Sequence, residues 1–326
     1  MTSTARRLHI CLGTQCNNNC LFCMEDDRGA RAERLSHIDT AAAKRILDEA
    51  SDRAEVMFTA GEPTLREDLP DLLEYARQVG YRQVGLISNG RRLSYAPYLD
   101  RLCRSGLNYV VISIHAPTAR AHDGLTRTPG SFVQTCSGLA NVQALRGRGG
   151  GLRFVTATVL NRRNLPVLAE HVRFLQGFDP DEMVLNVVQP VGGGARHFAR
   201  LVPRAMEVVA GVQDAVGSLP SIPDNLRLLD LPRCVTNGLP PSLVGFVEAH
   251  EHFEPAGEVL AGATGENRGE GGEGEALVLV TKAGLDEVLR VKGPDCVRCV
   301  LDAQCDGVWR RYAEAHGFNE FRPVVG

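Results

Sequence analysis

The sequence has no long apolar segment, no excess of one charge and no secretion signal. Across its 326 residues the uncharged runs stay well short of the ~20 residues that a membrane-spanning helix needs. Its 36 Lys and Arg against 39 Asp and Glu give a formal net charge of -3, so no overall basic field exists to hold nucleic acid. The first ten residues, MTSTARRLHI, lack the apolar core of a secretory signal. We therefore expect a cytoplasmic globular protein without a membrane partner, and the charge balance gives no support for a nucleic-acid partner.

What the sequence does contain is cysteine, ten residues in all. Disulfides are not expected in the reducing cytoplasm, so metal binding is the leading interpretation of these thiols. Two groups stand out: C-x3-C-x2-C over residues 16–23 and C-x2-C-x5-C over residues 296–305. Cys11, Cys103 and Cys136 lie in apolar company, and we expect them in the core.

Short β-rich runs alternate with helical stretches between the two cysteine groups. The expected strands cover residues 8–12, 56–59, 83–87, 109–114, 154–160 and 183–188, and helices are expected at 41–50, 69–79, 165–175 and 204–216. Because the strands are apolar almost throughout, the pattern predicts an α/β fold with a parallel sheet covered on both faces.

The amino-acid composition and the periodic pattern of the chain change near residue 220. Prolines punctuate a non-periodic region, and residues 257–274 are rich in Gly and Glu, which predicts a flexible surface loop. A strand is expected at 277–281 and a final helix at 308–316. We divide the chain into a core domain, 1–220, and a smaller C-terminal domain, 221–326.

Polar residues follow the predicted strands at the edge of the sheet where parallel α/β proteins gather their ligands. They are Gly61, Glu62 and Pro63 after the second strand, Ser88 and Asn89 after the third, Ser113 and His115 at the end of the fourth, Asn161 after the fifth and Gln189 after the sixth. Ordinary readings compete: Gly-Glu-Pro and Ser-Asn-Gly are common turns, and a lone histidine at a strand end is often structural. Residues 192–194, Gly-Gly-Gly, are expected to form a flexible turn.

A cubane of four irons that only transfers electrons takes four protein ligands. Three thiolates on one loop would therefore hold such a cluster and leave one of its irons without a protein ligand. An open metal position can bind a substrate or cofactor directly. The alternative is a structural zinc site on Cys16, Cys20 and Cys23, completed by His9 or Cys11.

With the aromatic Phe22 just before the third cysteine, this first group resembles the signature of radical S-adenosylmethionine (SAM) enzymes. Residues 60–63, Ala-Gly-Glu-Pro, resemble the G-G-E-P motif with which that family binds the amino group of SAM. The first glycine is Ala60 here, which fits if the position needs no positive φ. The resemblance covers residues 8 to about 200 and implies a partial (β/α)6 TIM-like barrel.

The resemblance also implies the ligands of the site. Cys16, Cys20 and Cys23 would hold a 4Fe-4S cluster that binds SAM. The residues around SAM would be Phe22, Gly61, Glu62, Pro63, Ser88, Asn89, Ser113, His115, Asn161 and Gln189. We assign no catalytic side chain beyond the cluster.

The second cysteine group, Cys296, Cys299 and Cys305, resembles the SPASM and twitch extensions of part of that family, which hold auxiliary 4Fe-4S clusters. Cys234 would be the fourth ligand of one such cluster. A zinc knuckle and unmetallated thiols are the alternatives.

The resemblance implies an enzyme that reductively cleaves SAM to a 5'-deoxyadenosyl radical, which takes hydrogen from a small molecule or from a peptide or protein side chain. An electron donor such as flavodoxin or ferredoxin is then required. Nothing before the first strand is long enough for a separate leader-peptide domain, which favours a compact substrate. One competing hypothesis is a non-catalytic iron-sulfur or metal-binding scaffold. The other is RNA modification, which would require a basic face, whereas the sequence contains only scattered arginines.

Overall fold

The computed structural model describes residues 7–25, 29, 38–50, 53–149, 151–245, 250–255, 266–270, 276–281 and 287–326. Among these residues, no helix combines the length and the apolar character needed to cross a bilayer.

Seven parallel strands pair in sequence order and form the main sheet. They are β1 (Arg7–Cys11), β2 (Glu55–Thr59), β3 (Gln83–Ser88), β4 (Tyr109–Ser113), β5 (Arg153–Leu160), β6 (Glu182–Val187) and β7 (Leu226–Leu229). The first six match the predicted strands to within one or two residues. The seventh was missed, because it is only four residues long and lies among prolines.

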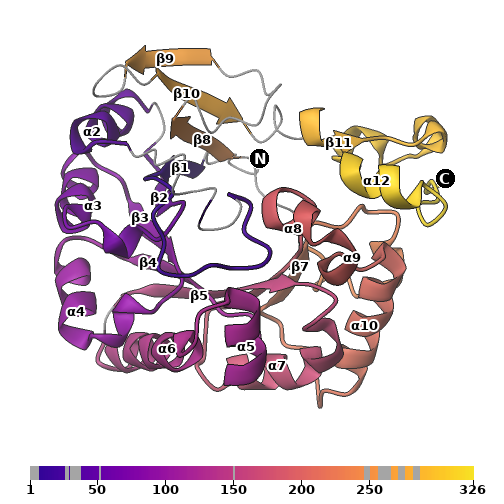
Figure 1. Ribbon diagram of the computed structural model, residues 1–326, viewed down its shortest axis with the longest axis horizontal. Coiled ribbons are helices and arrows are strands. Elements are labelled where there is room, and N and C mark those ends of the chain that lie inside the picture. The colour runs from indigo at the N-terminus through magenta and orange to yellow at the C-terminus, as the bar shows by residue number, and fades with distance from the viewer. Residues whose placement is uncertain are drawn as a thin grey trace.

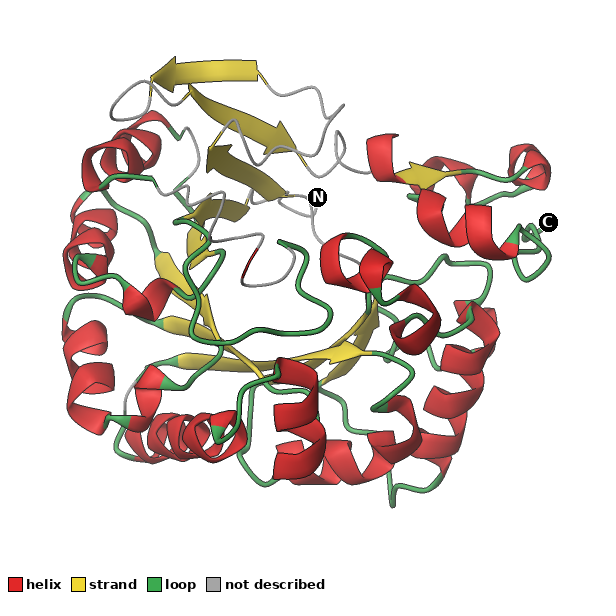
Figure 2. Ribbon diagram, viewed as in Figure 1, coloured by secondary structure: helices red, strands yellow, loops and turns green. Residues whose placement is uncertain are grey.

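Helices follow the strands and cover the convex side of the curved sheet (Figures 1 and 2). They are α2 (Thr40–Glu49), α3 (Leu69–Gln78), α4 (Ala96–Arg104), α5 (Ala119–Thr126), α6 (Ser131–Gly147), α7 (Leu168–Gln176) and α10 (Ala205–Gly217). Two short helices, α8 (Gly192–Arg196) and α9 (Phe198–Leu201), precede α10, and α8 packs on the loop that follows β1. Together with the sheet they make the partial TIM-like barrel that the sequence predicts.

Alternation along the strands decides which side chains meet the helices. Ile10, Phe58, Leu86 and Ile112 point outward and are fully buried in the main apolar core. On the inner face, Met57, Tyr109 and Val155 form a second, smaller apolar cluster. The inner face of the sheet thus has an apolar cluster of its own, separate from the main core. The loops at the C-terminal ends of the strands remain the expected place for a site.

The sheet continues past β1 instead of closing on β7. β8 (His250–Pro255) pairs in parallel with β1, and β10 (Ala276–Thr281) pairs antiparallel with β8. β9 (Glu266–Glu270) pairs with β10, so the expectation of a loop throughout 257–274 was wrong for these five residues. Strand pairing uses backbone groups and does not require the large apolar side chains that this stretch lacks. The rest of 257–274 lies outside the described residues.

The C-terminal segment carries the second cysteine group. The short strands β11 (Arg290–Val291) and β12 (Val308–Trp309) pair with each other, and α12 (Arg310–His316) follows. The Tyr312 hydroxyl accepts a hydrogen bond from the backbone N–H of Ala205 at 2.8 Å, at the start of α10. The segment thus packs beside α9 and α10 (Figure 1). The domain division at residue 220 stays a prediction, and β7, which lies beyond it, pairs with β6.

Candidate functional site

The three cysteines of the first group lie on one loop, residues 12–25, which we call the cysteine loop. It follows β1 and lies within the curve of the sheet (Figure 1). Backbone hydrogen bonds fix it to neighbouring segments: Glu62 N donates to Gln15 O at 2.8 Å, Leu21 N to Leu125 O at 2.9 Å, and Gly193 N to Cys23 O at 2.8 Å. Cys16, Cys20 and Cys23 are half-buried, and no disulfide joins them.

Two glycines allow the close approach of this loop. A Cβ on Gly61 would lie 2.6 Å from the Gly13 carbonyl oxygen, and one on Gly192 would lie 2.6 Å from the Cys23 carbonyl oxygen. Both glycines also have positive φ, 52° and 49°. Gly192 begins α8, so the expected flexible turn at 192–194 is instead a helical start packed on the cysteine loop.

Ala60, directly before Gly61, has a φ of 66°. The expectation that alanine fits because this position needs no positive φ is thus wrong. Ala60 therefore adopts a left-handed conformation that favours glycine.

Three predicted residues meet at the ends of β2 and β3. Oε1 of Glu62 accepts hydrogen bonds from Ser88 Oγ at 2.7 Å and from Thr64 Oγ1, and its Oε2 accepts one from the Asn89 backbone N–H at 2.7 Å. The Glu62 side chain is buried, and this burial raises its pKa, against the opposing effect of the hydrogen bonds. Glu62 thus ties the loop after β2 to the loop after β3.

Asn89 extends this network to the cysteine loop. Its Nδ2 donates to Asn17 Oδ1 at 2.6 Å and lies 4.0 Å from the sulfur of Cys16. The backbone N–H of Asn18 also points at the Cys16 sulfur, at 3.4 Å. N–H groups directed at a sulfur stabilise a thiolate, the form that binds metal.

The donor set of the cysteine loop fits an iron-sulfur cluster by its chemistry. It consists of three thiols within eight residues, and N–H groups of Asn18 and Asn89 face the sulfur of Cys16. Within the described part of the chain, no group of three or more His, Cys, Asp or Glu side chains is already arranged around a metal position. The thiols are thus brought to one loop without a preformed coordination geometry.

Phe22 of the cysteine loop packs against His115, which follows β4. Their ring centroids are 4.7 Å apart in an edge contact, and His115 stacks on His122 at 5.5 Å. The Val159 backbone N–H donates to Nδ1 of His115 at 3.2 Å. Burial, followed by the proximity of His122 and His171, holds the pKa of His115 well below its ordinary value, so it is neutral at pH 7.

The remaining predicted residues lie further apart. Asn161 is fully buried, and its side chain bonds to the Val159 carbonyl and the Arg163 N–H of its own loop. Ser113 ends β4 on the inner face, and Pro63 begins a short helical turn after β2. Gln189 points to the C-terminal side, where its Nε2 donates to Asp230 Oδ2 at 3.0 Å.

The second cysteine group gathers near Cys234. Burial raises the pKa of the Cys234 thiol to about 11, and the neighbouring thiols add to this effect. Those neighbours are the other three predicted ligands, Cys305, Cys296 and Cys299. In contrast, Cys11, Cys103 and Cys136 pack in or against the core, which confirms their prediction as core residues.

Sequence reasoning missed the arginines that brace the cysteine loop. Nη1 of Arg91 donates to the Asn17 carbonyl at 2.5 Å and to Asn18 Oδ1 at 3.0 Å, and Nε of Arg127 donates to the Asn19 carbonyl at 2.8 Å. It also missed Asp230 and Arg290, a buried ion pair at 3.0 Å. Single arginines and aspartates carry no local pattern, so only the position of Arg91 directly after Ser-Asn-Gly gave any signal.

Comparison with known proteins agrees with this geometry. A sequence model of the radical SAM superfamily matches residues 10–175, just over half of the chain. A probable GTP 3',8-cyclase of Metallosphaera sedula is 30% identical over 193 residues, which cover 59% of this chain and 58% of that protein. The PqqA peptide cyclase of Xanthomonas euvesicatoria pv. vesicatoria is 26% identical over 249 residues, which cover 76% of this chain and 64% of that protein.

The matched region spans less than two thirds of the length of each of these relatives. The crystal structure of Streptococcus suis SuiB superimposes with a TM-score of 0.51 at 16% identity, covering 74% of this chain and 49% of SuiB, and so has the same fold. With the cysteine loop in its place at the rim of this barrel, the chain belongs to the radical SAM superfamily.

Proposed function

We propose that the protein reductively cleaves SAM and uses the 5'-deoxyadenosyl radical to take hydrogen from a substrate. The sulfonium of SAM accepts one electron, its S–C5' bond breaks, and methionine and the radical result. The observation that carries the proposal is the cysteine loop: three half-buried thiols held at the rim of the barrel by contacts from the Glu62, Leu125 and Gly193 segments.

A 4Fe-4S cluster on Cys16, Cys20 and Cys23 would supply the electron and an open iron for the amino-acid end of SAM. The chain's own residues divide into two roles. We assign Gly61, Pro63 and Ser113 to the lining of the SAM site, since they lie at or just after the ends of β2 and β4. Gln189 is held on the C-terminal side by Asp230 and is left out of this lining. Six others position that lining through buried contacts, and they are Phe22, Glu62, Ser88, Asn89, His115 and Asn161.

The second cysteine group would hold one auxiliary 4Fe-4S cluster, as in a SPASM or twitch extension. Its proposed ligands are Cys234, Cys296, Cys299 and Cys305, and the support is that the last three lie near enough to raise the pKa of Cys234. Backbone N–H groups meet two of these sulfurs, Gly307 N at Cys305 and Val324 N at Cys299, both at 3.4 Å.

The substrate class stays at two possibilities, a small molecule or a peptide or protein side chain. The names of the relatives include a cyclase of a nucleotide and a cyclase of a peptide, and both fit a barrel that is open at one edge. We place the reaction in the cytoplasm with flavodoxin or ferredoxin as donor, since the cleavage consumes an electron.

The test is formation of 5'-deoxyadenosine by anaerobically reconstituted protein with dithionite and SAM. We expect the product even without substrate, because the cleavage step needs only SAM and an electron. Replacing Cys16, Cys20 and Cys23 together by Ala should abolish it. The matched control is Cys103→Ala, which removes a half-buried thiol of α4 outside both groups.

If fully iron-loaded protein forms no 5'-deoxyadenosine with any candidate substrate, the proposal fails. A non-catalytic iron-sulfur scaffold would then be the better interpretation.

A further inference from the structure

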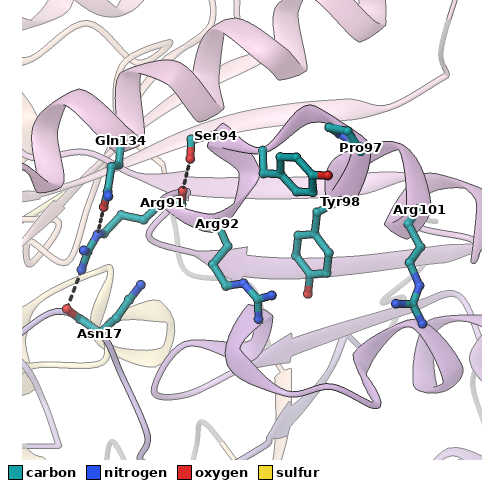
Figure 3. Close-up of a pocket in the computed structure, with 9 residues that line it drawn as sticks. Asn17, Arg91, Arg92, Ser94, Pro97, Tyr98, Arg101 and Gln134 are labelled. Atoms are coloured by element: carbon teal, nitrogen blue, oxygen red, sulfur yellow. Dashed lines mark hydrogen bonds between the residues drawn. The ribbon is translucent and has the colours of Figure 1, made fainter.

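A surface cavity of about 490 Å³ adjoins the cysteine loop (Figure 3). It lies between Asn17, the turn after β3 and the first turns of α4. Its lining includes three arginines, Arg91, Arg92 and Arg101. None of the nine described residues that line it is acidic, although acidic residues outnumber basic ones in the whole chain, 39 to 36. We call this cavity the basic pocket.

Two exposed arginines, Arg92 and Arg101, line the basic pocket. Arg92 lies with its guanidinium 4.6 Å from the centre of the Tyr98 ring and donates to the Thr64 carbonyl at 2.5 Å. The Arg101 residue is exposed, and no hydrogen bond or ion pair joins its side chain to another residue in the described part of the chain. Figure 3 shows Arg92, Tyr98 and Arg101 extending to the same side. The two contacts of Arg92 reduce the entropy that its side chain loses when a partner binds.

The basic pocket is in direct contact with the first cysteine group. Arg91 joins its wall to Asn17 and Asn18, the two residues after Cys16. Asn89 then connects Asn17 to the sulfur of Cys16, at 2.6 Å and 4.0 Å. Asn17 itself lines the pocket and directly follows Cys16 in the chain, so the pocket adjoins the first cysteine group.

We propose that the basic pocket is the docking surface of an acidic protein that delivers one electron to the proposed SAM-cleaving site. This inference rests on the proposed function. Each SAM cleaved consumes one electron, which no side chain of this protein can supply, so a separate carrier must approach the cysteine loop and be oxidised by one electron. The three arginines give charge complementarity to an acidic carrier, which speeds its encounter.

The residue types of the pocket favour a protein over a small anion. Tyr and Arg are enriched at the centres of protein interfaces, where they account for much of the binding energy. Besides Tyr98, the pocket presents Tyr95, which is 66% exposed and thus accessible to a protein partner.

The test compares two reductants on the same reconstituted holoenzyme, measured by 5'-deoxyadenosine formation. With reduced flavodoxin, Arg101→Glu should raise the half-saturating flavodoxin concentration about 10-fold, because one attractive charge becomes repulsive. The rate at saturating flavodoxin and the rate with dithionite should stay unchanged. Arg101→Lys should restore wild-type behaviour to within about 2-fold, since the charge is kept.

Salt and a matched variant provide controls. The difference between Arg101→Glu and wild type should shrink as NaCl rises from about 0.05 to about 0.5 M, because the Debye length falls below about 5 Å. Arg173→Glu makes the same charge change on α7, outside the pocket, and should behave as wild type.

Direct binding of oxidised flavodoxin, measured by calorimetry, separates this inference from the proposed function. Weaker binding by Arg101→Glu without any SAM cleavage by the wild type would support the docking surface and refute the proposed function. Dithionite-driven cleavage with an unchanged flavodoxin response in Arg101→Glu would overturn the docking surface alone. It would also be overturned if ATP or inorganic phosphate bound in an Arg101-dependent way while flavodoxin did not, because the pocket would then be a small-anion site.

Discussion

At the residue scale, Ala60 shows how a departure from a family motif is tolerated. The left-handed backbone at Ala60 (φ 66°) and Gly61 (φ 52°) brings the Glu62 N–H to the Gln15 carbonyl of the cysteine loop. A left-handed L-residue costs roughly 1–2 kcal/mol, which the surrounding hydrogen bonds offset. The turn therefore forms with alanine, at a cost in stability.

Ala60→Gly should stabilise the protein. Relief of the left-handed strain exceeds the extra entropy that glycine has in the unfolded chain, so we expect a gain of about 0.5–1 kcal/mol in the free energy of unfolding. Guanidinium denaturation of the metal-free protein measures it. The matched control is Ala140→Gly on the exposed face of α6, where the same change should cost about 1 kcal/mol. A loss of stability in Ala60→Gly would contradict the strain argument.

At the element scale, one buried ion pair fastens the C-terminal segment to the sheet. Oδ1 of Asp230, directly after β7, accepts from Arg290 of β11 at 3.0 Å, and its Oδ2 accepts from Gln189 after β6. The two charged side chains are 3% and 6% exposed. The Arg290 guanidinium also lies 4.0 Å from the ring centre of Trp309 in β12. The ends of β6 and β7 and the paired strands β11 and β12 thus share one set of contacts.

Arg290→Met should loosen the C-terminal segment. It removes the Arg290 guanidinium from the buried Asp230 carboxylate, and breaking a buried ion pair in this way costs about 3–5 kcal/mol. We expect faster hydrogen exchange over residues 287–326, measured by mass spectrometry. The double variant Asp230→Asn/Arg290→Met should recover part of this loss, because no unpaired charge remains.

The exposed pair Arg298–Asp295 is the control for this experiment. Both of its side chains are more than 60% exposed, so Arg298→Met should change exchange little. Equal effects of Arg290→Met and Arg298→Met would contradict a structural role for the buried pair.

At the scale of the whole molecule, seven cysteines divide between two places that are far apart in sequence. Cys16, Cys20 and Cys23 lie on the cysteine loop, whereas Cys296, Cys299 and Cys305 come from the segment between β11 and β12 and gather with Cys234. The two groups are thus positioned by different elements of the fold, β1 in one case and β11 with β12 in the other. The first group follows a strand of the ten-stranded sheet, whereas three cysteines of the second lie between the strands of the two-stranded sheet.

Two cubanes would give about eight irons per chain on full reconstitution. The triple Ala variant of Cys16, Cys20 and Cys23 should keep about four, with an absorption spectrum that SAM does not perturb, because a four-thiolate site has no open iron. Cys234→Ala should make the second site lose iron or become labile to oxygen while the SAM-responsive site persists. Iron analysis and spectroscopy measure both.

Cys136→Ala is the control, since Cys136 lies on α6 against the core and apart from both groups. Unchanged iron content and spectra in Cys234→Ala would remove Cys234 from the ligands. The second site would then have three protein ligands and an open position of its own.

The fold could be predicted to a large extent because its signals are local. Apolar runs placed six of the seven parallel strands, and the spacing of Cys16, Cys20 and Cys23 identified the loop that follows the first of them. β7 was not predicted because four residues are too few to show the alternation of apolar and polar side chains that marks a strand. It forms because the edge of β6 offers backbone hydrogen-bond partners. β9 escaped for the same reason beside β10.

The sequence by itself determined which residue types follow each strand, because the period of side chains along a strand and the spacing of cysteines are properties of the chain. Only the tertiary structure decided what those residues contact. Glu62 meets Ser88 and Asn89 from the next βα unit, and Asp230 meets Arg290 from a segment 60 residues further on. The curvature of the sheet brings these side chains together, and burial then makes each pairing strong, because a charge removed from water requires a partner.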